Sequence, residues 1–343
     1  MKAFIVDAEQ TMIERIPTES MEAYELLKQA EYLLRIKGVN ELLQAIEIAL
    51  EAIKIDPEYA DAYAWVGFGI LLKGSHGGLS PMLDVVFDAL PYIIKARDLD
   101  PNLSYAHTVM GIYYLWTVWD YISAEQEYLR AMELEPNNGL NVGQYLEFLN
   151  KMDRPKDVLS LKGLPATSTD LIKTYIISGN RAETENHIAI YFDSVGYKGD
   201  PYVGECYLWM EEFDSARVHL ESALQSENLI MLVPRFQACL AFAYYKTNQM
   251  QQAQVIIDQL IEQFNITSAM SPDFYIGWYY SGIGEVDSAF YWLEKAYNNR
   301  SQEFPWLKVD PAFNNLKEYE RYWDLYERTG HKAYDDYIAG KNK

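Results

Sequence analysis

Apolar residues recur every three to four positions along most of the chain, a spacing that predicts amphipathic helices. Between residues 21 and 34, one side of such a helix is apolar at Tyr24, Leu27, Ala30 and Leu34. Gly38 ends this segment, and residues 41–55 predict a second helix with three small residues on one face, Ala45, Ala49 and Ala52. Small side chains let two helix backbones approach closely, so the two segments predict a helical hairpin.

The hairpin pattern repeats along the chain. The turn at Asp56-Pro57 returns as Asp100-Pro101 and Glu135-Pro136, so the prolines lie 44 and 35 residues apart. Later, the same phase returns at Ala216, Ala253 and Ala289, which lie 37 and 36 residues apart. Periods of about 20–50 residues are typical of stacked supersecondary units, each packed on its neighbours.

The pattern divides the chain into five parts. We expect an irregular N-terminal lead (1–18), hairpins 1–3 (19–136), degenerate helical hairpins (137–198), hairpins 6–8 (199–300) and a C-terminal cap with a tail helix (301–343). The 44-residue spacing of hairpin two exceeds a 34-residue repeat by ten residues, which we place between its helices at residues 71–81, and Pro91 predicts a kink in its second helix.

The repeated positions resemble the consensus of the tetratricopeptide repeat. They are the small residues Gly67 and Gly111, the alanines Ala45, Ala89 and Ala124, and the prolines Pro57, Pro101 and Pro136. The resemblance implies an all-α fold, an α-solenoid with a right-handed superhelix of about eight hairpins. The terminal hairpin of such an array must hide one apolar face, and we expect a cap built by Trp306, Leu307, Val309, Phe313 and Leu316.

Both ends of the chain resemble the tetratricopeptide regions of two kinds of bacterial regulator. The opening IPTESMEAYELLKQAEYLL and the ending WLEKAYNNRSQEFPWLKVDPAFNNL are similar to segments that flank these arrays in adenylate-cyclase-type and winged-helix transcription proteins. In those proteins the array follows a catalytic or DNA-binding domain. Since this sequence has no such domain, the resemblance implies an interaction module of a regulatory system.

A second stripe of aromatic residues accompanies the packing stripe on the first helix of each hairpin. In this repeat family that side of the helix faces the concave groove. Two interpretations stay open: the aromatics form a partner-binding groove, or the groove is narrow and they fill it themselves. The predicted groove residues are Trp65, Phe68, Tyr105, Trp116, Tyr202, Trp209, Phe242, Tyr245, Phe274, Tyr275 and Trp278.

The charge of the chain narrows the choice of partner. Fifty acidic and 29 basic residues leave a net charge of −21, without the basic stripe that a nucleic-acid surface needs. We therefore expect no direct nucleic-acid binding. With no apolar run long enough to span a membrane and no visible signal peptide, we expect a cytoplasmic protein, or a periplasmic one if a membrane segment precedes this chain in the full gene product.

Residues with the potential for chemistry are scattered. The five histidines and two cysteines form no metal-ligand pattern, and the glycines around Gly69 and Gly74 lack the strand and lysine of a phosphate loop. No nucleophile motif is present. We predict no catalytic residues, no metal site and no cofactor, and hence a protein that is not an enzyme.

The sequence therefore predicts a non-catalytic interaction or sensor scaffold, part of a bacterial regulatory system. Its aromatic concave groove would bind a peptide, a partner helix or a second copy of the chain, which would make a homodimer. The alternative is a small-molecule sensor that uses the same groove, and a compact set of polar groups among the aromatics would favour it.

Overall fold

The computed structural model describes residues 17–36, 38–75, 78–161, 168–195, 200–224 and 233–341. Most of the predicted N-terminal lead, residues 1–16, lies outside these ranges. All regular secondary structure in the described residues is helical, which confirms the all-α prediction.

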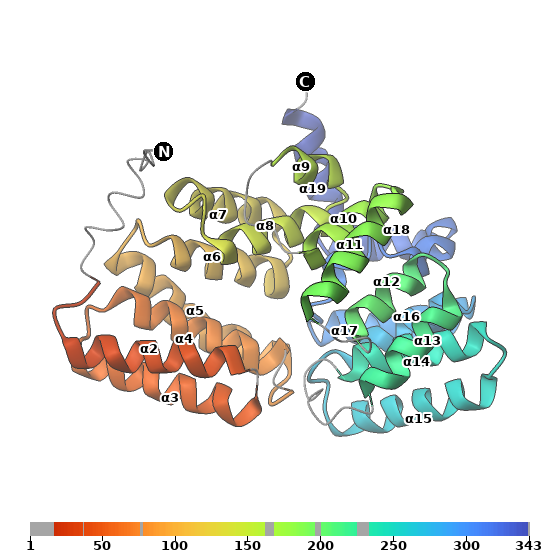
Figure 1. Ribbon diagram of the computed structural model, residues 1–343, viewed down its shortest axis with the longest axis horizontal. Helices are drawn as coiled ribbons and strands as arrows, with labels where there is room; N and C mark the ends of the chain where they lie inside the picture. The colour runs from red at the N-terminus through yellow and green to blue at the C-terminus, as the bar shows by residue number, and fades with distance from the viewer. Residues whose placement is uncertain are drawn as a thin grey trace.

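The helices form antiparallel pairs that follow one another along the chain (Figure 1). The first four hairpins are α2 (Met21–Ile36) with α3 (Val39–Ile55), α4 (Ala60–Ser75) with α5 (Met82–Leu99), α6 (Ser104–Tyr113) with α7 (Tyr121–Leu134), and α8 (Gly139–Lys151) with the short α9 (Pro155–Ser160). The next four are α10 (Ser168–Ile177) with α11 (Arg181–Val195), α12 (Pro201–Trp209) with α13 (Phe213–Leu224), α14 (Val233–Lys246) with α15 (Met250–Ile266), and α16 (Pro272–Gly282) with α17 (Val286–Asn298). The described residues thus form eight hairpins, the number expected from the repeat pattern.

Hairpins two, three, six and eight close over a glycine on the first helix. A Cβ atom at Gly67 would lie 2.6 Å from Cγ1 of Ile93 on the paired helix, and one at Gly277 would lie 3.0 Å from Cγ of Leu293. The alanines of the second helices, such as Ala89, are fully buried in the same seams. The repeat positions read from the sequence are therefore the contacts that hold each hairpin together.

Two hairpins depart from the regular pattern. In hairpin two, α4 continues to Ser75 and α5 begins at Met82 with Pro81 as its N-cap, so helix takes up part of the extra length. In hairpin three, α6 passes into a π-helix, η1 (Tyr114–Val118), before Trp119 adopts a left-handed conformation at φ 57° and turns the chain toward α7.

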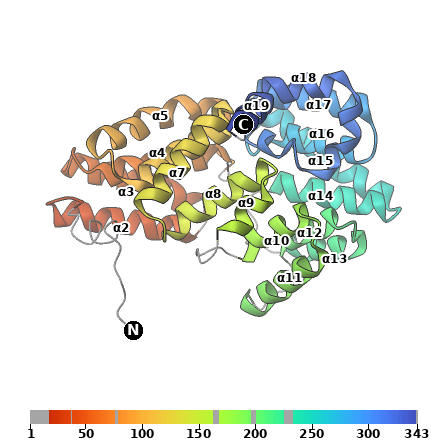
Figure 2. The same ribbon diagram turned by 90° about the horizontal axis from the view of Figure 1, so that it is seen from above.

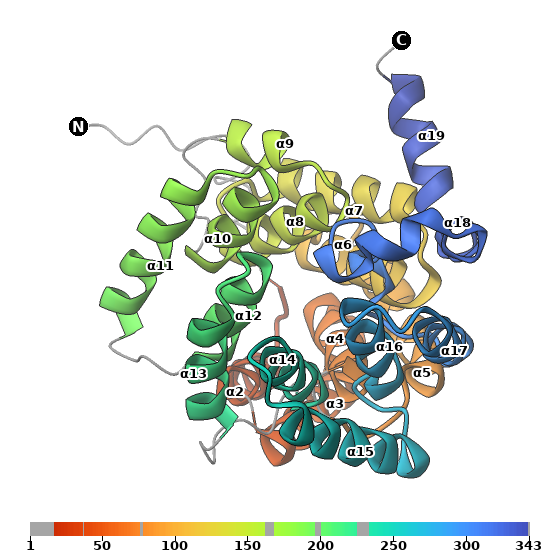
Figure 3. The ribbon, with the colours of Figure 1, turned by 90° about the vertical axis from the view of Figure 1, so that its right-hand side faces the viewer.

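The first helices of the hairpins form the inner, concave layer. Neighbouring first helices pack side by side, as α4 with α6, α12 with α14 and α14 with α16. Figure 3 shows α6, α8, α10, α12, α14 and α16 following one another around a curve.

After α17, the chain forms the predicted cap. It consists of the 3₁₀ helices η2 (Phe304–Trp306) and η3 (Pro311–Glu318), followed by α18 (Glu320–Arg328) and α19 (His331–Lys341). Four of the five residues expected to seal the last hairpin are buried and Val309 is partly buried. The Phe313 ring lies 5.6 Å from that of Phe274 on α16, which places the cap on the inner layer of hairpin eight.

The cap also joins the end of the solenoid to its middle. Trp119, which follows α6, has its ring 5.3 Å from Tyr297 of α17 and 5.2 Å from Phe304 of η2. Nη1 of Arg154, before α9, donates a hydrogen bond of 2.6 Å to the hydroxyl oxygen of Tyr334 on α19. Figure 2 shows α19 next to α7, between the two halves of the molecule. The array therefore curves until its eighth hairpin meets its third.

Candidate functional site

Three of the predicted groove residues form an aromatic cluster on α4 and α6. The Trp65 ring lies 4.7 Å from that of Tyr105 and 6.3 Å from that of Phe68, and Phe68 meets Tyr105 edge to face at 6.1 Å. All three side chains stay partly exposed. This cluster, which we call the N-terminal aromatic cluster, is an apolar surface on the inner layer that the described residues leave partly uncovered.

The matching residues on α16 are covered by the cap. Phe274 lies 5.4 Å from Phe304, and the indole N–H of Trp278 donates to Oδ2 of Asp310 at 2.9 Å. Only 4% of Trp278 is exposed, and Phe274 and Tyr275 are also buried. Here the aromatics and the cap fill the inner face together.

Trp306 of the cap enters the inner layer between α8, α10 and α12. The Nζ atoms of Lys173 and Lys151 lie 4.4 and 5.2 Å from the centre of its ring, and the Trp209 ring lies 5.8 Å away. Two ammonium groups on one indole are an unusual density of cation–π contacts for a buried site. The positive charges of these two ammonium groups must be balanced by nearby carboxylates.

Glu205 on α12 supplies that balance. Its Oε2 lies 2.6 Å from Nη2 of Arg235 and 3.0 Å from Nζ of Lys173. Burial acts to raise the pKa of Glu205, but the charges of Arg235 and then Lys173 outweigh it and lower the pKa to about 2. The group is a paired, structural ion cluster beneath Trp306.

The remaining predicted groove residues lie at separate places. Trp116 is buried in η1, while Tyr202 is 38% exposed at the edge of α12 with its ring 5.1 Å from Phe236. Tyr245 on α14 is partly buried, 6.4 Å from the ring of Tyr279. Apart from Trp116, Tyr202 and Tyr245, the predicted groove residues therefore fall into three regions. These are the N-terminal aromatic cluster, the packing under the cap, and a third region around Trp209, Phe242 and Trp278.

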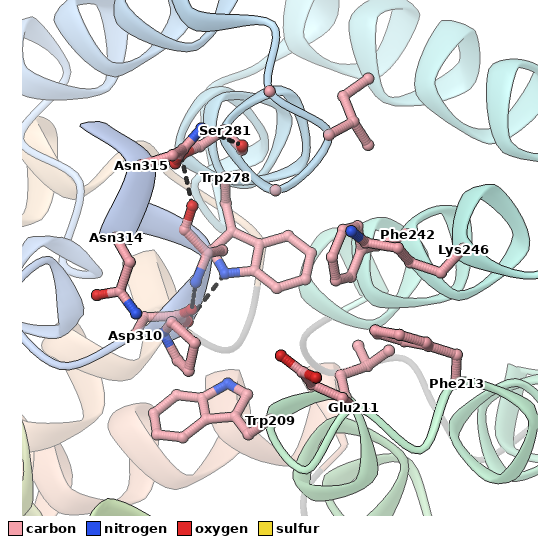
Figure 4. Close-up of a pocket in the computed structure, with 16 residues that line it drawn as sticks. Trp209, Glu211, Phe213, Phe242, Lys246, Trp278, Ser281, Asp310, Asn314 and Asn315 are labelled. Atoms are coloured by element: carbon pink, nitrogen blue, oxygen red, sulfur yellow. Dashed lines mark hydrogen bonds between the residues drawn. The ribbon is translucent and has the colours of Figure 1, made fainter. Parts of the chain in front are cut away.

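That third region is a pocket of about 500 Å³ between α12, α14, α16 and η3 (Figure 4). Its aromatic walls are Trp209, Phe213, Phe242 and Trp278. The Phe242 ring lies 5.3 Å from Trp278 and 6.0 Å from Phe213, each edge to face. Pockets of this size that combine aromatic walls with a few polar groups are typical of small-molecule sites.

The polar groups of the pocket come from three elements. Asp310, before η3, is buried and accepts the Trp278 indole N–H through Oδ2 and the backbone N–H of Ala312 through Oδ1, both at 2.9 Å. Burial raises the pKa of its carboxyl to about 6, although these two hydrogen bonds act to lower it. Glu211 and Lys246 are exposed residues that also line the pocket.

Two side-chain groups of the pocket show unusual environments. The indole nitrogen of Trp209 is buried without a hydrogen-bond partner among the described residues. The ammonium of Lys246 lies 5.1 Å from the ring centre of Phe242 and 5.7 Å from that of Phe213. The ammonium over the two rings shows that this aromatic wall accommodates a cation.

Three residues that line this pocket, Trp209, Phe242 and Trp278, were predicted from the sequence as groove residues. Four other lining residues were not predicted: Phe213, Glu211, Lys246 and Asp310. One signal was available for Asp310: Asp310-Pro311 repeats the Asp-Pro turns at residues 56 and 100. As in those turns, the aspartate precedes a helix, here as the N-cap of η3. The other residues lie at helix ends and carry no periodic signal.

No protein-family model and no curated protein matches the sequence. Among solved structures, the chain is similar to the Cut9-Hcn1 hetero-tetramer of the APC/C, with a TM-score of 0.56 and 15% identity over 91% of this chain and 57% of that chain. The chain thus spans little more than half of that structure's chain. It is also similar to YrrB, a protein described as having an unusual peptide-binding site (TM-score 0.28, 17% identity, 62% of this chain and 91% of that one). A third is the tetratricopeptide domain of P58(IPK) (TM-score 0.28, 14% identity, 90% and 92%). The similarity to the Cut9-Hcn1 chain supports the fold alone, a tetratricopeptide-repeat-like α-solenoid.

The described part of the chain lacks two features that would point to a membrane or a metal. No helix there is both long and apolar enough to cross a membrane. No group of three or more histidine, cysteine or acidic side chains in those residues is arranged to hold a metal ion.

Proposed function

We propose that the protein is a non-catalytic interaction scaffold that binds an apolar peptide segment or a partner helix on the concave side of hairpins 1–3. The observation that carries the proposal is the N-terminal aromatic cluster of Trp65, Phe68 and Tyr105, whose side chains are partly exposed and lie within 6.3 Å of one another. Tryptophan and tyrosine in a concave apolar surface are the residue types that most often anchor protein interfaces.

Electrostatics favours a partner without strong negative charge. The chain carries a net charge of −21. At the cluster itself, burial raises the pKa of the Tyr105 phenol, and the nearby charge of Glu31 raises it further. An acidic segment would be repelled, whereas apolar or basic residues would not. The resemblance of both chain ends to bacterial regulators supports a place for this scaffold in a regulatory system.

The test is a selection of binding peptides followed by substitution of the cluster. A phage-displayed peptide library is panned on the protein, and the affinity of enriched peptides is measured by fluorescence polarisation. Trp65→Ala combined with Phe68→Ala should weaken binding by roughly 30-fold or more, since interface anchors contribute about 2 kcal/mol or more.

The matched control is Trp323→Ala on α18, because Trp323 is 51% exposed and lies outside the cluster. It should leave peptide affinity unchanged. Failure to enrich any peptide, or equal binding by the double variant with its helical circular dichroism intact, would contradict the proposal.

The pocket between α12, α14, α16 and η3 favours a second candidate function, small-molecule sensing. It holds a compact set of polar groups among aromatic walls, which is the arrangement that distinguishes a ligand site from an open peptide groove. A ligand there would touch both the repeats and the cap, so its binding would be coupled to the stability of the cap. Thermal unfolding in the presence of candidate ligands measures this coupling.

A further inference from the structure

The charges and rings of the pocket define the class of ligand it suits. We propose that the pocket binds a small organic cation, with its cationic group between the Trp209 and Trp278 rings and facing the carboxylates of Glu211 and Asp310. This inference rests on the second proposed function, ligand binding in the pocket, and adds the chemical class of the ligand.

The first argument is the wall. Indole and phenyl rings attract cations through the negative face of the ring, and several rings around one space form a cage for alkylammonium groups. Trp209, Phe213, Phe242 and Trp278 come from three hairpins to make such a wall. Figure 4 shows the Trp278 and Trp209 rings on opposite sides of the space, with Glu211 and Asp310 between them on either flank.

The second argument is the chain's own ammonium group. Nζ of Lys246 lies 5.1 Å from the Phe242 ring centre and 5.7 Å from that of Phe213. The ring faces at this side of the pocket thus already hold an alkylammonium. Lys246 is an exposed residue at the end of α14, so its side chain can move into solvent when a ligand enters.

The third argument is the uncompensated carboxylates. Neither Glu211 nor Asp310 forms an ion pair with a basic residue in the described part of the chain, and Asp310 is buried with only neutral N–H donors as hydrogen-bond partners. A buried carboxylate without a cation carries a desolvation cost that a bound cation would relieve. Burial raises the pKa of the Asp310 carboxyl, and the charge of Lys173, which acts to lower it, does not offset the burial.

The binding experiment uses choline and benzyltrimethylammonium as probes, measured by isothermal titration calorimetry. The matched neutral probe is 3,3-dimethylbutanol, which has the shape of choline without its charge. Benzoate serves as an anion of similar size to the aromatic probe. We expect saturable binding of at least one cation, about tenfold tighter than the neutral probe, and no binding of benzoate.

Substitutions then test where the cation sits. Glu211→Gln and Asp310→Asn should each weaken cation binding several-fold, whereas Lys246→Met should strengthen it by removing the competing ammonium. Glu212→Gln is the control, since the neighbouring Glu212 pairs with Arg181 outside the pocket and should have no effect. If Asp310→Asn does not fold, the Glu211 and Lys246 variants, both at exposed residues, still decide the question.

The pH dependence gives an independent readout. Because the pKa of Asp310 is about 6, its carboxyl is charged at pH 8 and mostly protonated at pH 5, so cation binding should weaken several-fold on acidification. Asp310→Asn should remove most of this change. The other charged groups that face Asp310 are Glu205, Lys173, Lys317, Glu211 and Lys246.

Three results would overturn the proposal. Equal affinity for choline and 3,3-dimethylbutanol would show that the pocket binds small molecules without a preference for a positive charge. Binding of benzoate alone would assign the pocket to anions. If no probe shows saturable binding at millimolar concentration, both cation binding and small-molecule sensing by this pocket are rejected. The proposed peptide binding by hairpins 1–3 is tested separately and would not be affected.

Discussion

On the concave side of hairpins 1–3, Trp65 and Phe68 remain partly exposed, whereas on the concave side of hairpin eight Phe274 and Trp278 are buried. Hairpins in both halves share one seam contact, a glycine of the first helix against an aliphatic side chain of the second, as Gly67 against Ile93 and Gly277 against Leu293. The difference comes from residues 301–316, which lie on the inner face of the C-terminal half. The same sequence pattern therefore serves as an exposed surface in one half and as a core in the other.

The comparison also separates the two proposals. The open half offers a surface for a large partner, and the covered half offers a pocket between the repeats and the cap. The four predictions below test how different the halves are, and run from the largest expected effect to the smallest.

Removing residues 303–343 should have the largest effect. The truncation uncovers Phe274 and Trp278 and deletes several buried apolar side chains, each worth about 2 kcal/mol before the entropy of ordering the segment is subtracted. We expect aggregation or unfolding of the C-terminal hairpin, seen by size-exclusion chromatography and thermal melting. A truncated chain that stays monomeric with an unchanged melting curve would show that the cap does not stabilise the array.

Trp278→Ala and Trp65→Ala compare the halves directly. Trp278 is buried and donates a hydrogen bond to Asp310, so its loss should cost about 3–5 kcal/mol of unfolding free energy. Trp65 is partly exposed, and its loss should cost about 1–2 kcal/mol. Urea unfolding of the two variants measures both values. Equal costs would mean that the concave faces are equally buried.

The ion cluster beneath Trp306 should make the C-terminal half sensitive to acid. The pKa of Glu205 is lowered from 4.5 to about 2, so its ionised form stabilises the fold by roughly 3 kcal/mol at neutral pH. This contribution is complete above about pH 5 and disappears as the pH falls toward 2. Unfolding free energies of the wild type and Glu205→Gln should therefore differ at pH 7, and the difference should shrink steadily below pH 4.5 until it is nearly lost at pH 2. Glu212→Gln, at an exposed ion pair, should show no comparable gap.

The hairpin seams should behave alike in both halves, in contrast to the concave faces. Gly67→Ala and Gly277→Ala each place a Cβ atom within 3.0 Å of a neighbouring side chain, and each should destabilise the protein by about 1–3 kcal/mol. Gly139→Ala at the start of α8 has no atom within 4 Å of the added Cβ and should be neutral or slightly stabilising. Calorimetric melts of the three variants measure these effects; a loss in only one half would mean that the seams differ too.

The sequence by itself determined the hairpins and their phase. The contacts of Gly67 with Ile93 and of Gly277 with Leu293 join residues of one repeat, so the same residue types recur at each period and can be read without a structure. The cap was predicted for a related reason, because the last repeat must cover an apolar face and the apolar residues after Asn298 were the available cover.

Only the tertiary structure decided which aromatics are exposed and where the pocket lies. The contacts of Trp209 with Trp306, of Trp278 with Asp310 and of Arg154 with Tyr334 join segments 32 to 180 residues apart. Such contacts occur once each and depend on how far the whole array curves, which is the sum of small rotations between neighbouring hairpins. No periodic pattern records that sum, so the stripe on the first helices looked the same in both halves of the sequence.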